Sequence, residues 1–345
     1  QQKIDFFRRS STCFGRSALM LSGAGSLGPF HIGVVKALAE QDLLPTIISG
    51  SSAGSLVAAV VGTHHREDLL KMLSDETLVS LTTQEGGTPT GSQMKKSDLV
   101  ELVERLIPDL TFEEAQQKTG HYINVSVAPT AINQRSRLLN AMTSPNACIR
   151  EAVLASCAIP GIFPPVTLAA KNASGERKAY IATRKWVDGS VSDDLPAQRL
   201  MRLYGVNHFI SSQANPAVLW MLRDPDQTNV LAQIAGVYQA AARDLSKAIY
   251  PFAMNLVRNI YPMNILTRTW FGLITQEYTA DINVLPRQRF FNPAKLIAKL
   301  SAEETMQLVD EGERATWPKI EMIRNCTAVS RTIDQALYRL ESQGQ

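Results

Sequence analysis

Ser52 stands at the centre of a G-x-S-x-G pattern at residues 50–54, between two apolar stretches. The run Thr46-Ile47-Ile48-Ser49 predicts a short strand before it, and residues 56–61 predict a buried helix after it. The glycines permit a sharp turn that exposes a hydroxyl, and the helix N-terminus brings positive charge beneath it. The pattern in this context predicts a nucleophilic serine, although an ordinary tight turn can have the same five residue types.

A glycine-rich segment lies at residues 23–28, where a predicted strand at residues 18–21 gives way to a helix over residues 30–38. Dinucleotide-binding loops have this composition, but they are followed by an acidic residue at the end of the second strand, which holds a ribose. The second strand here ends in Ser49-Gly50-Ser51-Ser52, without an acid. We therefore favour a loop whose backbone N–H groups point at an oxyanion formed above Ser52.

Asp188 follows an apolar approach, Trp186-Val187, and precedes Gly189-Ser190. An acid at a strand end lies where open α/β sheets keep their functional sites, which favours a catalytic base. An isolated Asp-Gly pair is more commonly a turn former. These residues alone leave both interpretations open.

The elements that must position these groups alternate as strand, helix, strand, helix, which predicts parallel strands joined by right-handed crossovers. Further strands are predicted at residues 122–128 and 208–213, and a hairpin across residues 166–187. Beyond Pro216 the spacing is helical, through residues 227–257 and again through 301–340.

The composition sets broad limits on the class of protein. A chain of 345 residues, 45% hydrophobic and 19% charged, can bury a large core and should be globular. The net charge of +3 is too small to indicate a nucleic-acid partner, yet it does not oppose contact with an anionic membrane. The four cysteines form no C-x-x-C pair, so we expect neither a metal site nor a disulfide framework.

The glycine loop, the serine motif and Asp188-Gly189 occur in the order and context found in the patatin-like phospholipases. The chain resembles this family, and more narrowly its intracellular triacylglycerol lipase branch in yeasts and plant seeds, with bacterial relatives. The resemblance runs from about residue 15 to residue 340 and includes the flanking segments 29–34, 155–161, 207–210 and 316–317.

The resemblance implies a three-layer α/β/α fold with a mostly parallel central sheet and a helical C-terminal extension. It implies a remnant or linker at residues 1–16, a catalytic domain at 17–215 and the helical extension, packed on that domain, at 216–345.

For the site, the resemblance implies that Ser52 is the nucleophile and Asp188 its base, without a cofactor or metal. The remaining implied positions are backbone groups: the oxyanion hole at Gly23, Ala24, Gly25 and Ser26, and motif glycines at Gly28, Gly50, Gly54 and Gly189. The implied reaction is cleavage of fatty-acyl esters of triacylglycerol or glycerophospholipid through an acyl-enzyme. Lysophospholipid acyltransfer through the same acyl-enzyme, or a non-catalytic nucleotide- or lipid-binding module, are the alternatives.

Two departures from plant patatins concern the loop and the base. Plant patatins have Asp-Gly-Gly-Gly followed by a basic residue, whereas this chain has Ser22-Gly23-Ala24-Gly25 followed by Ser26-Leu27, without a side-chain cation. The pair after the base is Gly189-Ser190 instead of Gly-Ala or Gly-Gly, a change that we expect to be tolerated. His208 is the only histidine after Asp188 and alone fits the Ser, Asp, His order of α/β-hydrolases, but the resemblance argues against that role.

Residues 248–274 are apolar and aromatic, but prolines and arginines interrupt every window long enough for a transmembrane helix. Contact with a membrane or lipid-droplet surface, a homo-oligomer interface and ordinary core helices all fit this composition. We expect a cytoplasmic protein that acts on a lipid substrate, with peripheral attachment to a membrane or droplet left open.

Overall fold

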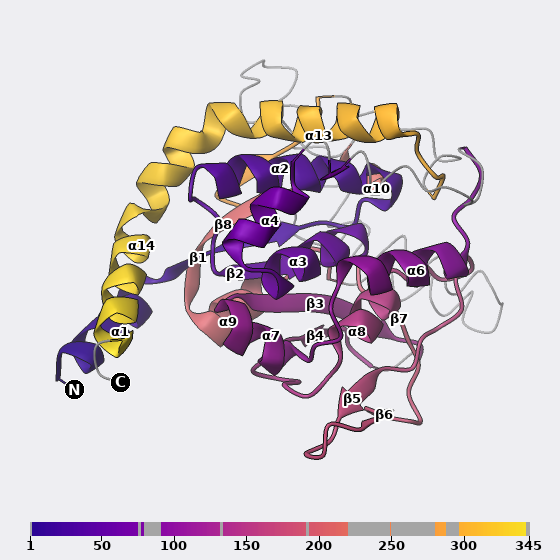
Figure 1. The fold of residues 1–345 in the computed structure, drawn as a ribbon, viewed down its shortest axis with the longest axis horizontal. Helices are drawn as coiled ribbons and strands as arrows, with labels where there is room; N and C mark the ends of the chain where they lie inside the picture. Colours follow the sequence, from indigo (N-terminus) through magenta and orange to yellow (C-terminus); the bar gives the residue numbers. More distant parts are fainter. Residues whose placement is uncertain are drawn as a thin grey trace.

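The computed structural model describes residues 2–74, 77–78, 91–131, 134–190, 193–219, 249, 280–287 and 297–342. A seven-stranded sheet runs through its centre in the order β4-β3-β2-β1-β8-β9, with β7 also paired to β3 (Figure 1). Its strands are β1 (Arg16–Leu21), β2 (Ile47–Gly50), β3 (Tyr122–Pro129), β4 (Arg137–Leu139), β7 (Trp186–Asp188), β8 (Val206–Ser212) and β9 (Ile282–Val284). Strands β4 and β7 run antiparallel to β3 and the others are parallel, which confirms the mostly parallel sheet.

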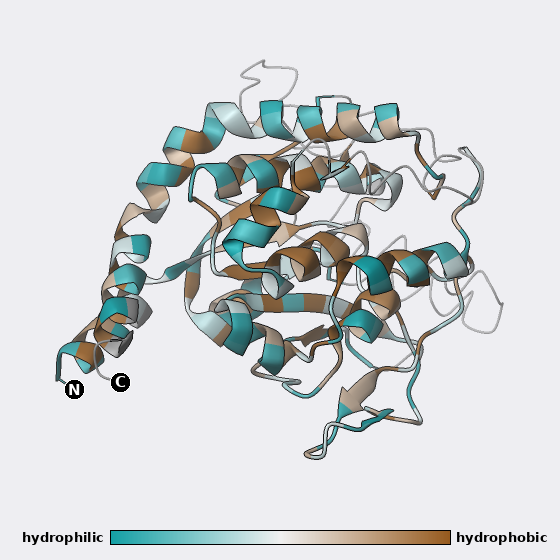
Figure 2. Cartoon of the chain, viewed as in Figure 1, coloured by the Kyte–Doolittle hydropathy of each residue, from teal (hydrophilic) through white to brown (hydrophobic). Residues whose placement is uncertain are grey.

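Helices cover both faces of the sheet, as the burial of β1 shows. Ala18 and Met20 pack into a cluster with residues of α9, while Leu19 and Leu21 pack into a cluster with α2 and α3. Alternate residues of a strand point to opposite faces, so both faces of β1 are buried and the fold has three layers. Apolar residues, brown in Figure 2, concentrate on the central strands and on α3. The helices are α1 (Gln2–Phe14), α2 (Gly28–Glu40), α3 (Ala53–Thr63), α4 (Arg66–Met72), α6 (Lys96–Leu106), α7 (Phe112–Thr119), α8 (Ile149–Ser156), α9 (Ala197–Tyr204), α10 (Pro216–Leu219), α13 (Ala302–Thr316) and α14 (Ile320–Ser342).

The end of the described chain is tied to the sheet and to its first helix. Helix α13 lies along α2, and α14 continues from it to contact α1 (Figure 1). Strand β9 joins the sheet beside β8 from a segment whose sequence predicted only helices. The three-segment division of the chain stays a prediction, and the predicted helical stretch 227–257 lies outside the described residues except for residue 249. No helix in the described ranges is long and apolar enough to cross a membrane.

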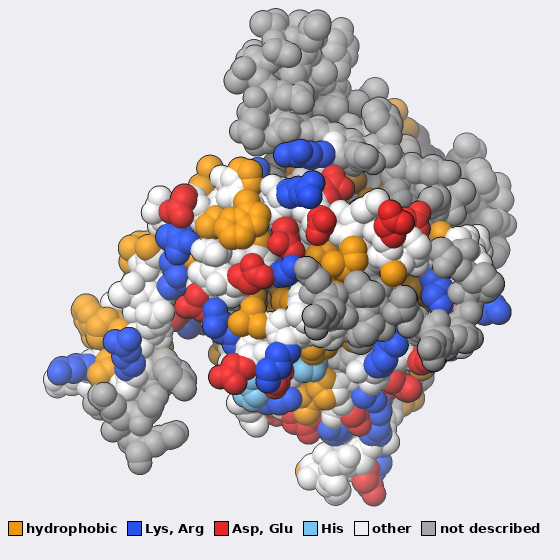
Figure 3. All heavy atoms as spheres, turned by 45° about the horizontal axis from the view of Figure 1, so that its top comes forward, with side chains coloured by type: hydrophobic (Ala, Val, Ile, Leu, Met, Phe, Trp, Pro, Cys, Tyr) orange, Lys and Arg blue, Asp and Glu red, His pale blue; other side chains and the backbone are white. Residues whose placement is uncertain are grey.

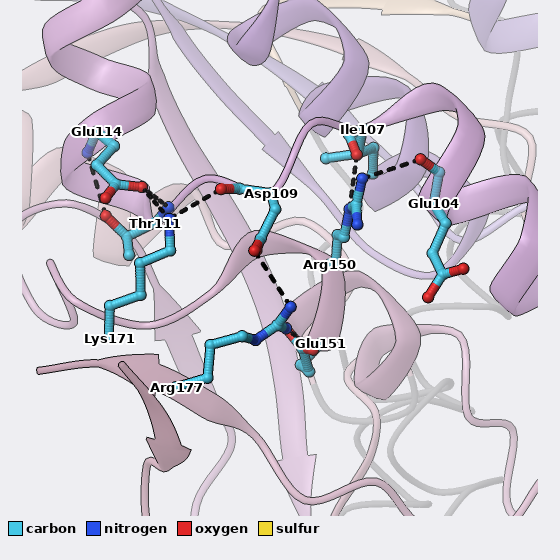
Figure 4. A network of polar contacts seen from close by, with 9 residues as sticks. All are labelled: Glu104, Ile107, Asp109, Thr111, Glu114, Arg150, Glu151, Lys171 and Arg177. Atoms are coloured by element: carbon cyan, nitrogen blue, oxygen red, sulfur yellow. Dashed lines mark hydrogen bonds and ion pairs between the residues drawn. The ribbon is translucent and has the colours of Figure 1, made fainter. Parts of the chain in front are cut away.

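A predicted hairpin is confirmed as β5 (Ala169–Lys171) and β6 (Arg177–Ala179), and a polar network fastens it to the body (Figure 4). The Lys171 ammonium group donates to the Glu114 carboxylate at the start of α7 and to the backbone oxygen of Asp109, each at 2.8 Å. Arg177 pairs with Asp109 and with Glu151 of α8. The network thereby fixes α8, whose last residues reach the predicted active site.

Candidate active site

Ser52 lies on the predicted turn between β2 and α3, with φ of 50° and ψ of −125°. A positive φ at a non-glycine residue is strained and occurs where the surrounding structure enforces it. The enforcing contacts are close: a Cβ on Gly50 would collide with the Gly54 backbone, and one on Gly54 with the backbone oxygens of Leu21 and Ser22. The two motif glycines are thus required by packing, and the strand-turn-helix expected around Ser52 is present.

Two further motif glycines permit close packing near the same point. A Cβ added to Gly28 would meet the Ala53 Cβ at 3.1 Å, so the first turns of α2 and α3 approach closely. A Cβ on Gly189 would collide with the backbone of Ser126 in β3. These glycines bring the three sequence motifs together at the carboxyl ends of β1 and β2, beside β7.

Strand β3 sets the spacing between Ser52 and Asp188. Val125 pairs with Gly50 of β2, Val127 pairs with Asp188 of β7, and both also pair with β4. Because β4 occupies one edge of β3, β2 and β7 must share the other edge, end to end. Gly50 and Asp188 are therefore two register positions apart on that edge, roughly 7 Å along the strand.

Asp188 is buried, with 2% of its surface exposed. Desolvation raises the pKa of its carboxyl to about 6, and interactions with the backbone and hydroxyl of Ser190 and with the Ser52 hydroxyl offset part of that rise. The Ser190 N–H lies 2.8 Å from Asp188 Oδ1. At neutral pH the carboxylate is mostly ionised and lies near enough to the predicted nucleophile to interact with it, which is the arrangement a general base needs.

Ser156, at the end of α8, fills the gap between β2 and β7. Its hydroxyl donates to the backbone oxygen of Ser126, between Val125 and Val127 on β3, at 2.8 Å. It accepts from the backbone N–H of Ser52 at 2.9 Å. Sequence reasoning did not identify Ser156 as part of the site, because a serine at the end of an apolar helix has no local signature of such a bridge.

The glycine loop leads from β1 into α2 through a 3₁₀ turn at Gly25–Leu27, with Gly25 at φ of 54°. The N–H of Gly23 donates to the buried Asp194 carboxylate at 2.6 Å. This bond occupies the Gly23 N–H, which is then not available to an oxyanion. The prediction that Gly23 is part of the oxyanion hole is corrected on this point. Ala24, Gly25 and Ser26 stay as predicted donors.

Neither His31 nor His208 is placed to act as the base for Ser52. His31 is fully buried, and its Nε2–H donates to the Ser22 carbonyl at 3.0 Å while Nδ1 accepts from the Ser212 hydroxyl at 2.7 Å. Burial lowers the pKa of His31 to about 4, so it is neutral. His208 of β8 pairs with Ser17 of β1. Ser17 lies four residues before Leu21, and Leu21 is the β1 residue that pairs with Gly50 of β2. Four residues of strand put His208 roughly 13 Å from the end of the sheet that carries Ser52.

A cavity of about 290 Å³ opens beside Ser52. Its lining is mostly aliphatic and aromatic, and includes Ile32, Leu56, Val57, Leu99, Leu102 and Phe163. Three charged residues, Asp98, Arg105 and Lys299, also contribute to the lining. A mostly apolar cavity that meets a serine hydroxyl is shaped for a hydrocarbon chain attached to a reactive carbonyl.

Comparison with known proteins gives a family match and close relatives. A family model described as patatin-like phospholipase matches residues 19–201. Triacylglycerol lipase 4 of Saccharomyces cerevisiae is 34% identical over 95% of this chain and 39% of its own length. Triacylglycerol lipase ptl3 of Schizosaccharomyces pombe is 32% identical over 98% of this chain and 73% of its own. Triacylglycerol lipase SDP1L of Arabidopsis thaliana is 32% identical over 98% of this chain and 44% of its own length. This chain therefore spans less than half the length of two of these three relatives.

Proposed function

The chain belongs to the patatin-like phospholipase family, and on that premise we propose that it is a serine acyl hydrolase of lipid esters. Ser52 is the nucleophile and Asp188 the base. The observation that carries the proposal is that Ser52 lines an apolar cavity and that its hydroxyl interacts with the buried Asp188 carboxylate. The nucleophile then faces the hydrocarbon pocket and has its base beside it.

The proposed reaction has two halves. Ser52 Oγ attacks the ester carbonyl carbon while its proton passes to Asp188, and the carbonyl oxygen becomes an oxyanion that faces the glycine loop. The carbon–oxygen bond to the alcohol breaks, Asp188 returns the proton to the leaving oxygen, and the acyl group stays on Ser52. Water then attacks the acyl-enzyme, gives a proton to Asp188 and releases the fatty acid, after which Ser52 regains its proton.

The substrate class proposed is the long-chain ester of triacylglycerol or glycerophospholipid. The aliphatic lining of the cavity supports a fatty-acyl chain, and the relatives named above are triacylglycerol lipases. Such a substrate resides in a membrane or droplet, so we propose peripheral contact with that phase. The aromatic segment 248–274, whose sequence fits this contact, lies outside the described residues apart from residue 249.

The decisive experiment compares purified wild type and Ser52→Ala on emulsified triacylglycerol, phosphatidylcholine vesicles and a soluble butyrate ester. Release of fatty acid by the wild type but not by the variant is the expected result, together with covalent labelling of Ser52 by a fluorophosphonate. Hydrolysis that survives Ser52→Ala would remove the nucleophile assignment. An absence of both labelling and hydrolysis in the folded wild type would favour a non-catalytic binding module.

A further inference from the structure

Asp194 is a buried carboxylate that the proposed reaction does not use, and it touches the glycine loop directly. Its side chain is 1% exposed in a fold that leaves most acidic residues at the surface. Oδ1 accepts the Gly23 N–H at 2.6 Å, and Oδ2 accepts from the Asn215 side-chain amide at 2.9 Å. The backbone oxygen of Asp194 also accepts from the Ser51 hydroxyl at 3.1 Å. One residue therefore joins the glycine loop, the residue before Ser52 and the segment after β8.

Hydrogen bonds hold both ends of the glycine loop: the Ser22 hydroxyl accepts from the Ala214 N–H, and the Leu27 N–H donates to the Ala24 carbonyl. Ala24 is buried in the core, whereas Gly25 has a left-handed backbone conformation and no side chain to pack. A loop of this kind is fixed mainly by hydrogen bonds to its backbone, and a bond to a carboxylate is roughly twice as strong as one between neutral groups. The short Gly23–Asp194 contact is such a bond and lies one residue before the predicted oxyanion donors.

We propose that Asp194 is a positioning residue, whose carboxylate holds the glycine loop so that the N–H groups after Gly23 face the ester carbonyl above Ser52. The inference rests on the proposed function, because it concerns the geometry of the same site. Asp194 is not among the residues that line the cavity at Ser52, and it acts through Gly23.

Burying the Asp194 carboxylate costs free energy, and a neutral side chain could link the same segments without that cost. Desolvation, with smaller contributions from the charges of Asp188 and Asp193, raises the pKa of Asp194 to about 7, and the hydrogen bonds from Asn215 and Gly23 offset part of this rise. Burying an acid close to another acid is unfavourable unless its hydrogen bonds offset the loss of water. An asparagine would satisfy Gly23 without the charge. Retaining a carboxylate here is explained if loop geometry is held more tightly by the stronger acceptor.

The test compares Asp194→Ala, which removes the acceptor, with Asp194→Asn, which keeps an oxygen for the Gly23 N–H. The control is Asp310→Asn, because the exposed Asp310 carboxylate lies on α13 and pairs with Arg314 at 4.0 Å. Turnover of a soluble butyrate ester gives kcat and KM, and hydrogen exchange of the peptide covering residues 17–27 reports the Gly23 amide without requiring activity.

Asp194→Ala is expected to lower kcat by about 10- to 10²-fold with KM within twofold, since a displaced donor acts mainly in the transition state. Exchange at the loop should accelerate. Asp194→Asn should recover part of kcat and of the protection, because an amide oxygen accepts more weakly than a carboxylate, and Asp310→Asn should match wild type. Equal losses in the Asn and Ala variants, or a rise in KM with kcat unchanged, would overturn the inference.

A second variant keeps the test open if Asp194→Ala does not fold. Asn215→Ala removes the partner of Oδ2 alone and is expected to lower kcat several-fold while loop exchange accelerates. Unchanged kcat and exchange in this variant, with no advantage of Asp194→Asn, would refute the positioning role. If loop exchange responds as expected but the wild type hydrolyses no ester, the proposed function fails while the structural link between Asp194 and the loop stands.

Discussion

At the scale of single residues, Asp188 combines two properties that conflict in a surface carboxylate. It is buried, which makes its charge costly, and it interacts with the Ser52 hydroxyl, which benefits from a strong acceptor. The raised pKa makes it a better proton acceptor than an ordinary aspartate while leaving it ionised at neutral pH. The proposed dyad does not use an imidazole, and the side chains of His31 and His208 make hydrogen bonds to other residues.

Asp188→Asn keeps the shape of the side chain and removes the base. We expect kcat to fall by about 10²–10⁴-fold, the usual contribution of a general base. His208→Ala is the matched comparison and should keep kcat within about twofold, because its ring contacts Ser17 at the far end of β1. Loss of turnover in folded His208→Ala with activity retained in Asp188→Asn would reverse the assignment.

The raised pKa of Asp188 predicts how activity and stability change with pH. Activity should fall as pH drops through about 6, because the protonated acid cannot accept the Ser52 proton. For stability the sign is opposite: a carboxyl with a folded pKa above its unfolded value favours folding at low pH, and this contribution is lost as pH rises through about 6. Asp188→Asn should therefore be more stable than wild type at pH 8, by about 1–3 kcal/mol, and not at pH 3.5. Thermal unfolding at both pH values measures this, and a gain at pH 3.5 alone would contradict it.

Ser156→Ala removes the hydroxyl between β2 and β7. The Ser52 N–H and the Ser126 carbonyl would lose their partner, at a cost of about 1–3 kcal/mol in unfolding free energy. We expect kcat to fall by about tenfold or more as the strained turn relaxes. Ser126→Ala is the control, since among the described residues its hydroxyl has no hydrogen-bond partner. Wild-type kcat in Ser156→Ala would show that the glycines hold Ser52 without help.

At the scale of elements, β3 acts as the common reference for the site. It pairs with β2, which carries the nucleophile turn, and with β7, which carries the acid. The hairpin network in Figure 4 stabilises α8 behind these strands, and α8 supplies Ser156. Exposed ion pairs of this kind are individually weak, so the spacing of Ser52 and Asp188 depends mainly on the strand register.

The close contact between α2 and α13 allows a test of whether the C-terminal helices contribute to the stability of the fold. A Cβ on Gly33 would collide with the backbone oxygen of Val309. Gly33→Ala should therefore destabilise the protein by about 1–3 kcal/mol through overpacking, seen as a lower thermal midpoint. Gln307→Ala, on the exposed side of α13, should change stability by less than about 0.5 kcal/mol. Equal midpoints for both variants would mean that α13 separates from α2 without loss.

At the scale of the whole molecule, we compare the charge of the surface with the lining of the cavity as determinants of substrate selectivity. The face shown in Figure 3 has acidic and basic side chains interspersed, without a large field of one sign. Selectivity is therefore expected to come from the apolar cavity and its length rather than from electrostatic attraction of a head group.

Leu102→Trp narrows the cavity from α6, whereas Ser52 lines it from the turn before α3. We expect hydrolysis of a long-chain ester to fall by tenfold or more, while a butyrate ester is cleaved within about twofold of wild type, because only the long chain needs most of the cavity volume. Leu102→Met, which conserves volume, should preserve both rates. A parallel loss on short and long chains would place the acyl group outside this cavity.

The amino-acid sequence by itself determined the local parts of this protein. The turn at Ser52, the glycine loop and the strands at residues 18–21 and 46–49 follow from residue type and short-range periodicity, and the structure confirms these elements. The tertiary structure decided what faces what: β7 beside the end of β2, Ser156 between them, Asp194 on the Gly23 N–H and β9 in the sheet. Strand register and hydrogen bonds between distant segments depend on how the whole chain packs. Local periodicity contains no information about which buried donor will meet which acceptor.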